Sequence, residues 1–193
     1  MSIDAVIIGV SDHNGWAVLV TVAGDGTLLD RRRVELIDPD LPRMPHHHDA
    51  QTLPLEQAID LVERVRASAD RHAKLVLDAV AITVPSPIRG VAIRKCPPLP
   101  STIAERLRDY RAQNVADTVM YRNALAGAAE SRGWSVQWYE SKKVFDAACA
   151  ALHVDDLDAH FLQVRRSIGP PWNQDHKVAM AAAIVAAARE KGA

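Results

Sequence analysis

Three acidic residues stand where carboxylates from separate elements could meet. Asp12 follows an apolar run, Glu56 lies in the first turn of a predicted helix, and Asp175 precedes an alanine-rich helical segment. Converging carboxylates hold Mg²⁺ or Mn²⁺, which can generate a hydroxide nucleophile and stabilise the leaving oxygen in phosphodiester hydrolysis. The three residues therefore predict metal-dependent chemistry if the fold brings them together.

Each of these carboxylates also has a purely structural interpretation. Asp12 precedes His13-Asn14-Gly15 and could stabilise a tight turn. An acid such as Glu56 is favoured in a helix's first turn by the macrodipole, and Asp175 could cap a helix by accepting from free backbone amides.

Histidines occur beside two of the candidate positions. His176 and Lys177 follow Asp175 and could contact a phosphate or donate a proton. The run His46-His47-His48-Asp49 could bind a transition metal or a phosphate, and we take His48, with Asp12 and Asp175, as a candidate metal ligand. Neighbouring side chains diverge in an extended chain, so three adjacent imidazoles do not easily reach one ion. A flexible polar loop is the alternative.

Basic residues are concentrated in one segment of a chain whose formal net charge is −1. Residues 89–111 contain six basic and two acidic side chains, which is compatible with a phosphate-binding patch and equally with a solvated helix face. The candidate nucleic-acid contacts are Arg89, Arg94, Lys95 and Lys177.

Length and composition are those of one globular domain, residues 1–193, with 48% hydrophobic and 24% charged residues. The sequence has neither a membrane-length apolar run nor a basic region ahead of an apolar one, so we expect a cytoplasmic protein without membrane contact. The two cysteines, Cys96 and Cys149, have neither metal-ligand nor disulfide-framework spacing.

The elements that must position these side chains follow from apolar periodicity and turn residues. Residues 5–23 predict a β-hairpin, and Leu28–Ile37 predicts a third antiparallel strand. Later strands are expected at Ala79–Val84 and Trp134–Glu140. Helices are expected from about Thr52, from about Thr102, over Val115–Ser131, over Lys142–Leu152 and over Asp175–Glu190, with a less regular polar segment before the last.

This order predicts an α/β fold, a mixed five-stranded sheet with helices on both faces. It resembles the ribonuclease H-like superfamily over most of the chain. The later part is most similar to Holliday-junction resolvases of the RuvC type, through Glu130-Ser-Arg-Gly-Trp134, Ser135-Val-Gln-Trp-Tyr139, Lys142-Lys-Val144 and Asp175-His-Lys before an alanine-rich helix.

The resemblance implies an acidic site that this sequence fills only in part. The family pattern Gly-Ile-Asp at the end of the first strand reads here Gly9-Val10-Ser11-Asp12, so Asp12 comes one residue late. A regular strand would point Asp12 at the opposite face. The expected fourth strand carries no acid at its end, and Val178 stands where the family has a second acid one turn after Asp175.

We therefore predict a resolvase-like domain that binds branched or structured nucleic acid. Any metal-dependent endonuclease activity would depend on Asp12, Glu56, Asp175 and His176, with Mg²⁺ or Mn²⁺ as cofactor. The alternative is a catalytically inactive scaffold that acts through protein partners or as a homodimer. Sugar kinases and actin-like ATPases share the core fold, but they need two such domains and glycine-rich phosphate loops.

Overall fold

The first three strands form an antiparallel meander, as the sequence predicts. The computed structural model describes residues 6–191, so the expected start of the hairpin at Ala5 lies outside the described residues. Strands β1 (Val6–His13), β2 (Trp16–Val22) and β3 (Leu28–Glu35) pair in sequence order. Gly15 has a φ of +82° in the two-residue turn between β1 and β2, a conformation that favours glycine.

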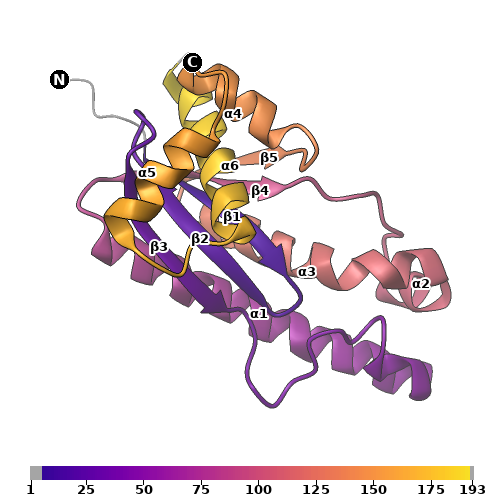
Figure 1. The fold of residues 1–193 in the computed structure, drawn as a ribbon. Coiled ribbons are helices and arrows are strands. Elements are labelled where there is room, and N and C mark those ends of the chain that lie inside the picture. Colours follow the sequence, from indigo (N-terminus) through magenta and orange to yellow (C-terminus); the bar gives the residue numbers. More distant parts are fainter. Residues whose placement is uncertain (1–5, 192–193) are drawn as a thin grey trace.

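Two further strands extend the sheet on the other side of β1. Strand β4 (Ile88–Arg94) pairs parallel to β1, and β5 (Ser135–Tyr139) pairs parallel to β4. The order β3-β2-β1-β4-β5 gives the predicted five-stranded mixed sheet (Figure 1). The carboxyl ends of the parallel strands β1, β4 and β5 meet at one edge of this sheet.

Helices cover both faces of the sheet and divide the apolar core into two layers. One layer contains the long helix α1 (Leu55–Thr83), the short α2 (Ile103–Arg108) and α3 (Tyr110–Glu130). The other contains α4 (Val144–Leu152), α5 (Asp158–Ile168) and α6 (Gln174–Lys191). A short 3₁₀ turn, η1 (Asp49–Thr52), precedes α1. None of the described helices is long and apolar enough to cross a membrane.

Helix α6 lies unusually close to the centre of the sheet. A Cβ atom on Gly9 of β1 would lie 1.8 Å from the carbonyl oxygen of Ala179. The small side chains of this alanine-rich helix permit the close approach. The packing fixes the first turn of α6 against the end of β1, where Asp175 stands.

The strand predicted at Ala79–Val84 is wrong. These residues are the last turns of α1, which ends where the backbone N–H of Val84 donates to the carbonyl of Val80. Ala73, Leu77 and Val80 are buried at the same helical spacing as the buried residues earlier in α1. The short apolar run therefore belongs to this helix. The fourth strand is Ile88–Arg94, between the prolines at 87 and 97, and its last residue, Arg94, is followed by a second basic residue, Lys95.

The polar segment before the last helix also differs from expectation, because it contains α5. Leu157, Phe161 and Val164 are buried at helical spacing and hold this helix on the α6 layer. The remaining predicted elements agree with the structure to within a few residues, although α3 begins at Tyr110 rather than near Val115. The helix expected from about Thr102 is confirmed, and Thr102 and Glu105 form a capping box at the start of α2.

Candidate functional site

Strict alternation along β1 decides which side chains can meet at the sheet edge. Ile8 and Val10 belong to the core under α1 and α3, while Ile7 belongs to the core under α6. The ladder between β1 and β2 continues without a bulge through Ser11, Asp12 and His13. Asp12 therefore faces α3, whereas Ser11 and His13 face α6.

Asp12 is buried and paired with arginine. Its side chain is 0% exposed, and its Oδ2 accepts a hydrogen bond of 2.8 Å from Nε of Arg122 on α3. Nε of Arg94, at the end of β4, lies 3.9 Å from Oδ1 of Asp12. The positive charges of two guanidinium groups thus offset the negative charge of the Asp12 carboxylate. This carboxylate is therefore not available to bind a divalent cation.

Asp175 occupies the other face of the same sheet edge. Its Oδ1 accepts from the hydroxyl of Ser11 at 2.9 Å and contacts Nε2 of His13 at 2.8 Å. The His13 ring stacks on Trp16 with ring centroids 3.9 Å apart. Burial raises the pKa of Asp175, but the hydrogen bonds from His13 and Ser11 outweigh it and leave that pKa below its usual value. Asp175 is therefore a carboxylate at neutral pH, already held by two donors.

Glu56 and His176, the other predicted catalytic residues, do not complete a cluster with Asp12 and Asp175. Glu56 is exposed in the first turn of α1, in the layer opposite α6. His176 is buried, and its Nδ1 lies 2.7 Å from Oδ1 of Asn173, so it faces the start of its own helix. Burial, and after it the charge of Arg31, lowers the pKa of His176. The structure does not bring Asp12, Glu56, Asp175 and His176 together.

The segment His46-His47-His48 is held against α3 by hydrogen bonds. His46 is 1% exposed, and its Nδ1 lies 2.7 Å from Oδ1 of Asp117. The same carboxylate accepts the backbone N–H groups of His46 and His47. His48 is exposed, whereas Asp12 is buried on the sheet. The alternative of a flexible loop thus does not describe His46, and the structure gives His48 no acidic partner among the described residues.

Polar residues on the first half of α3 fasten this whole edge. Asp117 holds the histidine run, Thr118 donates to Asn14 in the first turn, and the hydroxyl of Tyr121 donates to the carbonyl of Arg43. One turn after Thr118, Arg122 binds Asp12 and also donates to the carbonyl of Lys95 at 3.2 Å. Sequence reasoning missed Arg122, although a charged residue at a buried helical position signals a buried partner.

The donor set at this edge does not fit a divalent metal. On the α6 face the side chains that bind Asp175 are a hydroxyl and an imidazole rather than further carboxylates; on the α3 face Asp12 is neutralised by arginine. Within residues 6–191 no three His, Cys, Asp or Glu side chains group so that they could hold a metal ion. Mg²⁺ needs several oxygen ligands, including carboxylates, to compete with its hydration.

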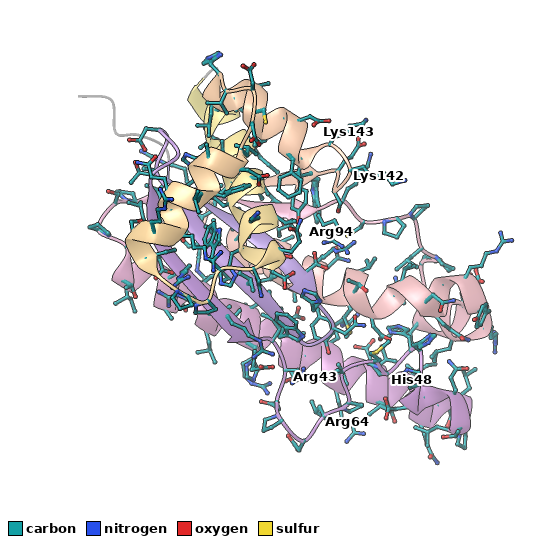
Figure 2. The ribbon with its side chains drawn as sticks, viewed as in Figure 1. Arg43, His48, Arg64, Arg94, Lys142 and Lys143 are labelled. Atoms are coloured by element: carbon teal, nitrogen blue, oxygen red, sulfur yellow. The ribbon has the colours of Figure 1, made fainter. Side chains whose placement is uncertain are left out.

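The four basic residues predicted to contact nucleic acid do not all lie at one place in the structure. Arg89 lies at the start of β4, at the opposite end of the strand from Arg94. Lys177 pairs with Asp158 on α5 and lies over the Phe161 ring. Arg94 and Lys95 do share the sheet edge, and Lys142 and Lys143, labelled in Figure 2, follow the end of the neighbouring strand β5.

Comparison with known proteins places this fold. No protein-family model and no curated protein sequence matches the chain. The structure of Thermus thermophilus RuvC in complex with a Holliday junction substrate is similar, with a TM-score of 0.55 and 15% identity over 97% of this chain and 96% of that chain. A second Thermus thermophilus RuvC structure gives a TM-score of 0.50 and 18% identity over the same shares of the two chains. The chain therefore has the ribonuclease H-like fold of the RuvC type, as its sequence suggested.

Proposed function

We propose that this protein is a RuvC-like domain that binds branched or structured nucleic acid without metal-dependent hydrolysis. The observation that carries the proposal is the pairing of Asp12 with Arg122 and Arg94, on the face of β1 opposite Asp175. A metal-dependent nuclease needs carboxylates on one face, so that the ions they hold can activate water and stabilise the leaving oxygen.

The same edge suits an anion better than a cation. Arg94 ends β4 and Lys95 follows it, while Lys142 comes shortly after the end of β5, and none of the three donates a hydrogen bond to a carboxylate among the described residues. Phosphate neutralisation by such side chains dominates nucleic-acid affinity. The similarity to RuvC bound to a Holliday junction supports a branched ligand.

The test compares binding and cleavage on one set of substrates. Fluorescence anisotropy at low salt is expected to show metal-independent binding of a four-way DNA junction in preference to a linear duplex of the same length. The same substrates should stay intact with millimolar Mg²⁺ or Mn²⁺. Calorimetry of the wild type and of Asp175→Ala should give no difference in metal binding. Metal binding that is lost in Asp175→Ala, together with cleavage, would overturn the inactive assignment.

A second candidate function is a scaffold for a protein partner or for a homodimer. On α1, Leu75 is 59% exposed and Ile82 is 85% exposed, and their spacing of seven residues places them on one face of the helix. Light scattering of the wild type and of Ile82→Gln tests this candidate. A dimer that the substitution converts to a monomer would favour it.

A further inference from the structure

Two buried polar atoms at the sheet edge face each other without a hydrogen bond. Oδ1 of Asp12 and Nε of Arg94 are both inaccessible to solvent, and neither has a hydrogen-bond partner among the described residues. They lie 3.9 Å apart, beyond hydrogen-bond distance. Buried polar groups in proteins are normally satisfied, so this pair needs an explanation.

The two arginines beside Asp12 have different surroundings. Arg122 is 7% exposed and donates to both Asp12 and the carbonyl of Lys95. Arg94 is 36% exposed, so its outer guanidinium nitrogens can reach a ligand while Nε stays inside. Arg122 and Arg94 together carry two positive charges against the single negative charge of Asp12, so this group of three keeps a net positive charge.

Neighbouring side chains add positive charge to this position. The backbone N–H of Lys95 donates to the carbonyl of Tyr139, which places Lys95 beside the end of β5. Glu140 is held by Lys143 at 2.8 Å; this hydrogen bond, and more weakly the charge of Lys95, lowers the pKa of Glu140. Lys142 has no such partner in the part of the chain that the structure describes, and it stands three residues after Tyr139, the β5 residue that pairs with Arg94 (Figure 2). The surroundings of Arg94 are therefore net positive.

We propose that Asp12 is a positioning residue that holds Arg94 to bind a phosphate group at the end of β4, assisted by Lys95 and Lys142. Asp12 itself does not touch the phosphate. Its free Oδ1 is the anchor for Nε, and this leaves the fork of outer nitrogens to take two phosphate oxygens. This inference rests on the proposed function, because it specifies how that surface recognises nucleic acid.

The proposal predicts an effect opposite to simple electrostatics. If charge alone mattered, replacing Asp12 by a neutral residue would remove a negative charge near the ligand and strengthen phosphate binding. If Asp12 positions Arg94, the same change weakens binding although the protein becomes more positive. The sign of one measurement thus separates the two explanations.

The experiment measures binding of a fluorescent four-way junction over a range of salt concentrations. Arg94→Gln is expected to weaken binding about tenfold, the usual scale of one charge-assisted contact. It should also reduce the slope of log K against log salt by about 0.9, the value for one phosphate contact on duplex DNA. Asp12→Asn should weaken binding severalfold without changing the slope, because every cation remains. Arg166→Gln, an exposed change on α5, is the matched control and should bind as the wild type.

Two further variants sharpen the test, and the first of them keeps it decisive if Asp12→Asn does not fold. Arg94→Lys retains the charge but lacks the Nε fork, so it should weaken binding with the salt slope unchanged. In the Arg94→Gln background, Asp12→Asn should have no additional effect on affinity.

Strands with and without a 5′-phosphate separate a terminal phosphate from a backbone diester as the ligand group.

Three results would overturn the inference. Stronger binding by Asp12→Asn, wild-type binding by Arg94→Lys, or wild-type affinity in Arg94→Gln would each show that Asp12 does not act through Arg94. Any of these with intact junction binding by the wild type would leave the proposed function standing. Failure of the wild type to bind any nucleic acid at 50 mM salt would instead refute both proposals.

Discussion

Removing Arg122 should destabilise the protein severely, because it leaves the carboxylate of Asp12 buried. The two side chains are 7% and 0% exposed, so solvent screens their interaction very little. Breaking a buried pair by deleting one partner usually costs about 3–5 kcal/mol. Arg94 lies 3.9 Å from the same carboxylate and compensates in part, which favours the lower end of that range. Arg122→Met fills a similar volume, so a cavity contributes little.

Urea unfolding followed by far-UV circular dichroism at pH 7 measures this effect. The expected loss of about 3 kcal/mol is a large part of the roughly 5–15 kcal/mol that stabilises a typical domain. Arg66→Met, which removes an exposed pair with Glu63 on α1, should lose less than about 1 kcal/mol. Combining Asp12→Asn with Arg122→Met should restore much of the loss, because no buried charge then remains. A loss in Arg122→Met as small as in Arg66→Met would refute the assignment of a buried, coupled pair.

Two other perturbations test the packing and the surface charges. Gly9→Ala should prevent tight packing of α6, since its Cβ would lie 1.8 Å from the carbonyl oxygen of Ala179. A Cβ at Gly127 of α3 would meet nothing within 4 Å, so Gly127→Ala should raise the stability of the protein by about 0.5–1 kcal/mol. Thermal unfolding of both variants checks this contrast, and equal melting temperatures would contradict it. Asp38 has a pKa lowered to about 2, chiefly by its hydrogen bond with His72, so its contribution to stability is complete above about pH 4 and is lost as the pH falls through 2. Asp38→Asn should flatten the pH dependence of urea unfolding between pH 4 and 2, and an unchanged acid limb would show that this group is not coupled to folding.

The sequence was informative where local pattern and burial agree. Two apolar runs around a short polar turn located the β1–β2 hairpin, and the alanine-rich segment located helix α6. The register argument at Gly9-Val10-Ser11-Asp12 also agrees with the structure, because the strand is regular and Asp12 faces away from Asp175. These features depend on periodicity, which a single sequence records.

The sequence was misleading where one apolar run suits two kinds of element. Residues 79–84 are short, β-branched and followed by prolines, which is typical of a buried strand, yet they complete a helix of 29 residues. That error moved the fourth strand and concealed the position of Arg94 at its end. Pairing of Asp12 with Arg122 was not predictable, because the residues are separated by 110 positions and only the packing of α3 on β1 brings them together.

At this edge of the sheet, the sequence differs from the resolvase pattern at several positions, and each difference makes the charge of the edge less negative. Ser11 and Val178 stand at positions where the resolvase pattern that the sequence resembles has acids, and Arg94 ends β4 with Lys95 directly after it. Each departure removes negative charge or adds positive charge at the same edge, while the remaining acids are bound by donors of the protein itself. Restoring a single carboxylate, as in Ser11→Asp, would set two acids on the α6 face and still leave arginine at the end of β4. Such a variant should not bind Mg²⁺ at millimolar concentration in calorimetry; if it did, the arginine at the end of β4 would not govern the charge of this edge.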